Sequence, residues 1–398
     1  MTYVPRTEIE QKLVDAATRP SLGPVIVQAR RGAGKSSILR QVASRAAAAG
    51  RRPVTIDLER ICTSAVDFAR RFAASIDAAL GASGSQAREI RRTLAAELER
   101  RKPDPALLLD QALAYAEAMP VDPPLTLLLD ELGEMSRLSR HEGLRDAVAI
   151  VARRLATSGV STVASVSPAS RPGPLLEALR DACGGELQVL PLPPFDEREM
   201  ATFLKGSPAA PAAPAANEDL EPWMRATAGH PLYAEILARR VASGAGLLEA
   251  LRTEMSCPGG LLHQECRFDY HLLVERSRGH SVVRNILQIL SREEGLNLSG
   301  IAHHLRIQLP TALDYLSWLL EVGLIRRDGA GYVLADPVLR LWVTLNGPEP
   351  ADLLEQSVLL LESPRRVPLP PSRPRGPRPS RRRVVQHRRA PDSLIEID

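Results

Sequence analysis

The first half of the chain alternates short apolar runs with longer stretches in which apolar residues recur at helical spacing. We expect strands at Pro24–Ala29, Val54–Leu58, Leu125–Leu129, Val160–Val166 and Leu187–Leu190. The helical stretches between them lie near Ser36–Ala49, Ala65–Leu80, Ala87–Arg101, Ala106–Ala118 and Leu144–Thr157. Strands that alternate with helices form a parallel sheet with crossover helices. The pattern therefore predicts an α/β domain over residues 1–205.

The next part of the chain is helical in pattern. Residues 206–216 consist mainly of alanine and proline, a composition typical of a linker. Helical patterns follow at Glu218–Thr227 and Leu232–Ser243, and then continuously from Leu247 to Arg278. These patterns predict a helical lid domain over residues 217–279.

Residues 280–346 show three helical patterns followed by a hairpin. Asn297 is placed to cap the second helix, and Pro310 falls in the first turn of the third. Gly329 lies at the expected tip of the hairpin. Three helices and a hairpin in this order predict a winged-helix domain.

Residues 347–398 are expected to form a short helix and then a disordered tail rich in proline and arginine. From Ser363 onward there are ten arginines, three acidic residues and few large apolar residues. Such a segment cannot bury enough surface to offset its conformational entropy. The tail thus carries a net charge of +7 and the rest of the chain −3, which together give the formal net charge of +4, so the basic character belongs to the tail. The tail could bind DNA or another polyanion in a salt-sensitive way, or it could remain a solvated segment without a ligand.

Candidate chemistry begins between the first expected strand and the first expected helix. Strand, glycine-containing loop, Lys-Ser and helix form the layout of a P-loop. Its backbone N–H groups and the helix dipole bind phosphate oxygens. Lys35 is expected to reach the β- and γ-phosphates of ATP, and Ser36 to bind Mg²⁺. The loop residues expected to contact the nucleotide are Arg30, Arg31, Gly32, Ala33, Gly34, Lys35, Ser36 and Ser37.

One position departs from the usual P-loop pattern, because Ala29 stands where the first glycine is expected. Alanine disfavours a positive φ, so the first turn of the loop could have a different shape. We therefore expect nucleotide binding combined with slow hydrolysis.

Asp130 and Glu131 directly follow the apolar run Leu125–Leu129. In P-loop enzymes, acids at this point form the Walker B motif: Asp130 would hold Mg²⁺, and Glu131 would activate the attacking water. The alternative is a surface pair that caps the next helix. The following strand ends in small hydroxyl side chains, of which Ser167, or else Ser165, could sense the γ-phosphate. A strand that merely enters a turn is the alternative there.

Together these segments resemble the archaeal-type ATPase family, a branch of the STAND and AAA+ group of P-loop NTPases. The motifs that carry the resemblance are Tyr3–Glu10, the P-loop, Asp130-Glu131, Pro191–Asp196, Gly229–Tyr233 and Asp336–Trp342. The resemblance implies an ATP-driven switch made of a nucleotide-binding domain, a lid and a winged helix, with Pro231 packed near the adenine. It identifies no substrate and no arginine finger. Arg171 and Arg180 lie in suitable regions, and surface arginines are the alternative.

A winged helix can place its third helix in the major groove of DNA. Across residues 280–346, however, arginines and acids balance, and the third helix carries no cation. Phosphate binding requires a basic face. We therefore favour a packing module that restrains the ATPase, with DNA contact as the alternative.

Composition indicates the setting of the protein. Its four scattered cysteines suggest no disulfide framework, which fits a reducing cytoplasm. No apolar run approaches the roughly 20 residues of a membrane span. Only four of the 51 basic side chains are lysines, and this arginine bias indicates a GC-rich, bacterial genome. Cys257, His263, Cys266 and His271 lie close together in the sequence, but their spacing matches no usual zinc pattern.

These features predict an ATP-binding switch or regulator with weak ATPase activity and with ATP and Mg²⁺ as cofactors. An unidentified protein partner, or self-association, is expected, and no membrane is involved. A DNA-associated ATPase, acting as a motor or loader, is the alternative. A degenerate nucleotide-binding scaffold is a third possibility.

Overall fold

The computed structural model describes residues 3–19, 23–80, 85–118, 122–207 and 220–347. Most of the predicted linker and the predicted tail beyond Gly347 lie outside the described residues. Of the helices in the described ranges, none combines the length and the apolar character needed to cross a bilayer.

A five-stranded parallel sheet forms the core of the first part of the chain, with the strand order β2-β3-β4-β1-β5. Its strands are β1 (Val25–Gln28), β2 (Arg52–Asp57), β3 (Leu125–Asp130), β4 (Ser161–Val166) and β5 (Gln188–Pro191). Each strand begins and ends within two residues of its predicted bounds. The predicted parallel α/β sheet is therefore confirmed.

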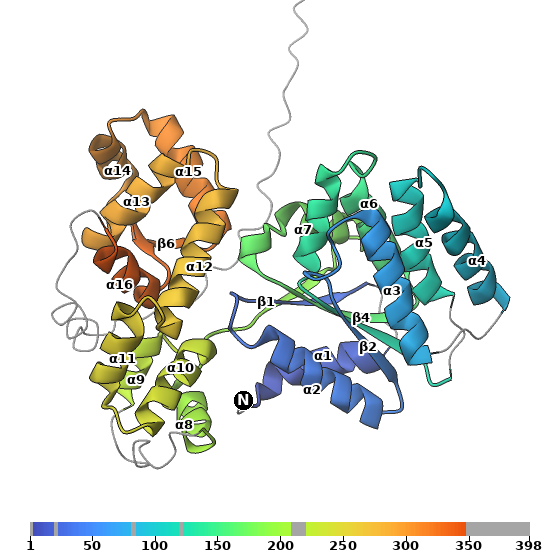
Figure 1. Ribbon diagram of the computed structural model, residues 1–398, viewed down its shortest axis with the longest axis horizontal. Helices are drawn as coiled ribbons and strands as arrows, with labels where there is room; N and C mark the ends of the chain where they lie inside the picture. The colour runs from blue at the N-terminus through green and yellow to red at the C-terminus, as the bar shows by residue number, and fades with distance from the viewer. Residues whose placement is uncertain (1–2, 20–22, 81–84, 119–121, 208–219, 348–398) are drawn as a thin grey trace, which may run out of the picture. The chain divides into compact units, whose positions relative to one another are not determined.

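Helices cover both faces of this sheet (Figure 1). On one face lie α1 (Thr7–Thr18) and α2 (Lys35–Ala48), and on the other lie α3 (Ala65–Leu80), α5 (Pro105–Glu117), α6 (Ala147–Thr157) and α7 (Gly173–Ala182), with α4 (Ser85–Glu99) outside them. Neighbouring strand residues point to opposite faces: Val27 packs with α1 and α2, whereas Ile26 packs with α3 and α5. The sheet is thus buried on both sides, as its apolar strands predict.

The second part of the chain is built of helices and one hairpin around a single hydrophobic core. Its helices are α8 (Glu197–Lys205), α9 (Glu221–Thr227), α10 (Pro231–Ala242), α11 (Leu247–Ser256), α12 (Leu261–Arg276), α13 (His280–Arg292), α14 (Leu298–Leu305), α15 (Leu309–Glu321) and α16 (Pro337–Leu345), and its hairpin is β6 (Ile325–Asp328) with β7 (Gly331–Leu334). The core extends from Met200 of α8 to Val343 of α16 and also includes Val4 and Phe195. Asn297 caps α14 through a 2.8 Å hydrogen bond from the Gly300 N–H, as predicted.

Two features of the helices differ from the sequence pattern. The helical stretch from Leu247 to Arg278 is divided into α11 and α12. The break falls at Cys257-Pro258-Gly259-Gly260, because proline and glycine disfavour a continuous helix. A Cβ at Gly260 would lie 2.2 Å from the Glu254 carbonyl oxygen, so the turn requires glycine there. Helices α1, α7 and α8 were not predicted, because the motif at the N-terminus and the proline-rich segments obscured their periodicity.

Candidate nucleotide-binding site

The P-loop (residues 29–36) begins as a continuation of β1. The Ala29 N–H donates a 3.2 Å hydrogen bond to the Val166 carbonyl oxygen of β4. Among the described residues, the positive φ angles of this loop belong to Gly32 (75°) and Gly34 (99°), not to Ala29. Alanine at the first position therefore causes no backbone strain, because the left-handed conformations fall on glycines.

Gly32 is also required by its neighbours. A Cβ at this position would lie 2.7 Å from His230 Cε1 and 2.9 Å from Leu232 Cδ2. His230 and Leu232 flank Pro231, the first residue of α10. The predicted adenine-side residue Pro231 therefore lies in a turn that packs directly against the P-loop.

Helix α2 begins at Lys35, with Gly34 as its N-cap. The N–H groups at this helix start, together with the helix dipole, form a favourable place for an anion. Ser36 is exposed at the first turn, whereas the Ser37 hydroxyl accepts a 3.0 Å hydrogen bond from Arg40. Ala33 is buried against the core beside the sheet. The loop therefore presents Ser36 to solvent and anchors its other side.

The Lys35 ammonium is almost fully buried and is bound by three oxygens. It donates to the Ala29 and Arg30 carbonyls, both at 3.1 Å, and lies 2.9 Å from Glu131 Oε1. The predicted phosphate-binding lysine and the predicted catalytic carboxylate are thus in direct contact.

Ser165 joins the two acids at the end of β3. Its hydroxyl hydrogen-bonds the Asp130 carboxylate and accepts a 2.9 Å hydrogen bond from the Glu131 N–H. Glu131 has φ 56° and ψ 50° and makes no cap hydrogen bond to the 3₁₀ helix η1 (Leu132–Arg140) that follows. A left-handed non-glycine residue costs of order 1 kcal/mol or more. This strain is consistent with a side chain held toward Lys35 instead of toward the helix.

Ser167, the first candidate for sensing the γ-phosphate, lies beyond the end of β4, after Ser165. It is the N-cap of η2 (Pro168–Ser170), and its carbonyl accepts a 2.8 Å hydrogen bond from the Ser170 hydroxyl. The contacts with Asp130 and Glu131 belong to Ser165, the alternative sensor residue.

The two P-loop arginines have partners that no sequence pattern indicates. Arg30 forms a 2.9 Å ion pair with Asp336, the N-cap of α16. Asp336 is buried and also accepts hydrogen bonds from the Tyr233 hydroxyl at 2.8 Å and the Val338 N–H at 2.9 Å. Burial alone would raise the pKa of Asp336, but Arg30, His230 and Tyr233 together lower it below its ordinary value.

Arg31 is held by α12. Its guanidinium pairs with Glu265, lies 3.7 Å from Asp269 and stacks over the Phe268 ring at 4.5 Å. Burial raises the pKa of Asp269 to about 6, although Arg30 and Arg31 oppose this shift. Arg30 and Arg31 of the P-loop are therefore both bound to elements of the second part of the chain.

His230 connects α10 to the same loop. Its Nε2 lies 2.9 Å from the Arg31 carbonyl oxygen, which can only accept, so Nε2 carries the proton. Burial, together with the nearby Arg30, lowers the pKa of His230 to about 4, and the ring is neutral near pH 7. The preceding Gly229 has φ 70°, and a Cβ there would lie 2.4 Å from the Phe195 carbonyl oxygen. The Gly-His-Pro-Leu turn thus requires its glycine.

The two arginines weighed as arginine fingers lie outside this cluster of contacts. Arg171 donates hydrogen bonds of 3.1 and 2.9 Å to the Glu321 carboxylate of α15. Arg180 is exposed in the last turn of α7. Neither has a contact with Lys35, Asp130 or Glu131 among the described residues.

Comparison with solved structures identifies the fold. A Walker-type ATPase of Pyrococcus abyssi superposes with a TM-score of 0.61 at 17% identity, covering 86% of this chain and 96% of its own. The ORC2 protein of Aeropyrum pernix superposes with a TM-score of 0.51 at 14% identity, covering 90% and 96%. No family model and no curated protein matches the sequence. At these identities the likeness concerns the fold, which is that of the P-loop ATPases.

The buried groups around the P-loop predict a specific pH dependence of stability. Below about pH 6.5 the unfolded chain protonates His230, whereas the native chain does so only near pH 4. Acidification through this window therefore removes up to about 3 kcal/mol. Asp269 acts in the opposite direction, because its native pKa is raised and the native state takes up the proton first. The wild type should show a small net slope.

Urea unfolding between pH 4 and 7 separates the two groups. His230→Gln leaves the contribution of Asp269, so its free energy of unfolding should rise on acidification. Asp269→Asn leaves the contribution of His230, so its free energy of unfolding should fall on acidification. The exposed His303 provides the control His303→Gln, which should follow the wild type. Parallel curves for all four proteins would contradict the assignment.

Proposed function

We propose that this chain is an ATP-binding P-loop ATPase that acts as a nucleotide-dependent switch with weak hydrolysis. The observation that carries the proposal is the Arg30–Asp336 ion pair, which connects the phosphate-binding loop directly to the start of α16. A nucleotide whose phosphates attract the Arg30 guanidinium would weaken the ion pair between Arg30 and Asp336. Nucleotide state and the packing of α16 are then coupled.

The proposed ATP site uses groups that already converge. The phosphates would contact the loop N–H groups and Lys35, which would exchange part of its contact with Glu131 for phosphate oxygens. Ser36, which is exposed, and Asp130 at the strand end supply the oxygen ligands that Mg²⁺ prefers. Glu131 Oε2 is buried and has no hydrogen-bond partner in the described part of the chain. A water bound there would satisfy it, in keeping with the proposed role of Glu131 as the base.

Slow hydrolysis follows from the charges near the site. An arginine finger contributes roughly 10³–10⁵ in rate, and of the two arginines considered for that role Arg171 is bound to Glu321 and Arg180 is exposed in α7. We therefore expect a switch that keeps its nucleotide bound and hydrolyses it slowly. The finer assignments stay proposals: membership of the STAND branch, the winged helix formed by α13 to β7, and a bacterial, cytoplasmic origin.

Two substitutions test the site. Lys35→Ala should weaken Mg²⁺-ATP binding at least tenfold, because the buried cation that faces the phosphates is lost. Glu131→Gln should retain ATP but stop turnover, because the amide cannot accept the proton of the attacking water. Calorimetry and phosphate release measure the two effects. Equal ATP affinity for wild type and Lys35→Ala would refute ATP binding at this loop.

The coupling is tested at Asp336, outside the P-loop. Asp336→Asn keeps the shape and the cap of α16 but removes the charge that holds Arg30. ATP affinity should rise roughly tenfold, about 1.4 kcal/mol, because ATP binding then no longer breaks an ion pair between Arg30 and a carboxylate. Glu321→Gln, which breaks the Arg171 pair, is the matched control and should leave ATP affinity unchanged. An Asp336→Asn affinity equal to that of the wild type would exclude the switch mechanism.

A DNA-associated ATPase is the second candidate, supported by the exposed Arg326 and Arg327 on β6. Helix α15 argues against it, because its exposed side carries Leu309, Leu313 and Asp314 and no cation. A gel shift with the full chain and with a chain ending at Glu362, with and without ATP, separates the candidates. The switch proposal expects at most salt-sensitive binding by the full chain, independent of ATP. Binding by the shorter chain that depends on ATP would favour the DNA-associated ATPase.

A further inference from the structure

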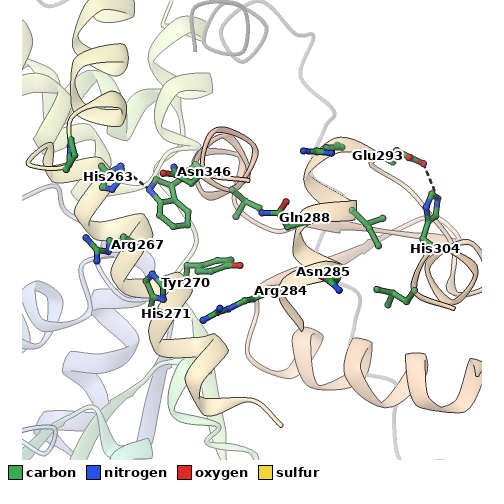
Figure 2. A pocket seen from close by; sticks show the side chains of 16 residues that line it. His263, Arg267, Tyr270, His271, Arg284, Asn285, Gln288, Glu293, His304 and Asn346 are labelled. Carbon is green, nitrogen blue, oxygen red and sulfur yellow. Dashed lines mark hydrogen bonds and ion pairs between the residues drawn. The ribbon is translucent and has the colours of Figure 1, made fainter. Parts of the chain in front are cut away.

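A cleft of about 970 Å³ lies between α12, α13 and α16, away from the P-loop contacts (Figure 2). Helix α12 contributes His263, Arg267, Tyr270 and His271, whose spacing places them on one face of the helix. Glu265 and Asp269, which hold Arg31, occupy the opposite face of the same helix. The cleft is therefore a second polar site, distinct from the proposed nucleotide site.

The floor of the cleft is aromatic. Tyr270 and Trp342 are buried, with ring centroids 5.2 Å apart. The Trp342 indole N–H lies 3.3 Å from His263 Nδ1. The Met255 carbonyl oxygen of α11 lies at the same distance of 3.3 Å from His263 Nδ1, so the imidazole is held between the indole and the α11 backbone. The floor thus consists of the Tyr270 and Trp342 rings with the His263 imidazole beside them.

The walls are basic. Figure 2 shows Arg267 and Arg284 on the two sides of Tyr270, from α12 and α13. Both are exposed, and neither has an ion-pair partner in the part of the chain that the structure describes. Arg292 lines the cleft as well, whereas the lining carboxylate of Glu293 lies 3.5 Å from His304. The positive charge of the cleft exceeds its negative charge.

Amide side chains complete the lining, namely those of Asn285, Gln288 and Asn346. Guanidinium groups bind phosphates and carboxylates through paired hydrogen bonds, and amides orient the rest of a ligand. Clefts of roughly 300–1,000 Å³ with a few polar groups on an apolar floor accommodate small molecules. A long polyanion would instead meet Glu293 and Glu294 at the end of α13, where Glu294 already pairs with Arg340 at 3.1 Å.

We propose that this cleft binds a small phosphate-bearing molecule, with Arg267 and Arg284 holding the phosphate and the Tyr270–Trp342 floor packing against the remainder. Its place in the fold connects it to the P-loop, a consequence that rests on the proposed function. Helix α12 carries Glu265 and Asp269, and α16 begins at Asp336, so the two helices that hold the P-loop arginines also form the cleft. A ligand here would act as an effector of the switch.

Inorganic tripolyphosphate is the probe, added to the full-length Lys35→Ala chain so that the P-loop competes least. Calorimetry should show a saturable site that is weakened at least tenfold by Arg267→Gln with Arg284→Gln. The matched control removes the same number of exposed arginines elsewhere, with Arg145→Gln and Arg252→Gln, and should bind as the parent does. Equal affinity in both double variants, or no saturable binding, would overturn the site.

A second readout is local to the cleft. The chain has three tryptophans, so Trp223→Phe with Trp318→Phe leaves Trp342 as the reporter. Tripolyphosphate should change its emission, and the change should vanish with Arg267→Gln and Arg284→Gln. A change produced by a single-stranded oligonucleotide but not by tripolyphosphate would replace the small-molecule site with a nucleic-acid groove. Failure of ATP to bind the unmutated chain would remove the proposed function without affecting these two tests.

Hydrogen exchange of residues 29–34 in the Lys35→Ala chain tests the effector role. Tripolyphosphate should alter their exchange through α12 and α16. Unchanged exchange at saturating probe would refute the effector role and confine the ligand to the cleft.

Discussion

The ion pair between Arg30 and Asp336 is the contact on which the proposed behaviour of the molecule depends. Asp336 is placed by two local features: it caps α16 and accepts the Tyr233 hydroxyl. A buried carboxylate of this kind is tolerated only when paired, and removal of one partner of a buried pair costs roughly 3–5 kcal/mol. Arg30 is about one-third exposed, so the lower end applies. The P-loop therefore supplies the cation that pairs with the N-cap carboxylate of α16, a helix far away in the sequence.

Three different helices of the second part of the chain contact the P-loop. Arg30 and Arg31 are neighbours in sequence but bind different elements, α16 and α12. His230 binds the carbonyl of Arg31 from a third element, α10. Three separate segments thus contact two successive residues of one loop. A shift of this loop would therefore alter its contacts with all three segments. This arrangement fits a switch better than a scaffold that only binds nucleotide.

Much of the fold could be predicted from sequence, because the strands are short apolar runs between amphipathic helices. The positions of Lys35 after β1 and of Asp130 and Glu131 at the end of β3 also follow from the sequence, and the structure brings Lys35 and Glu131 into contact. Their roles toward phosphate and Mg²⁺ stay proposals. The partners of Arg30 and Arg31 could not be predicted. Charge pairs between residues hundreds of positions apart leave no periodic signal, and this chain has many arginines. The choice between Ser165 and Ser167 likewise depends on the register of β4 beside β3, which the sequence does not reveal.

The position of Ala29 has a consequence for how such loops are recognised. Its N–H is still part of the sheet, and the loop turns only at Gly32 and Gly34. A search pattern that demands glycine at the first position therefore selects for a residue that this geometry does not need. A pattern that accepts any small residue at the first position, and still requires glycine at the two later positions, would match the residues whose backbone angles form the turn. Chains now passed over by the stricter pattern would then be found.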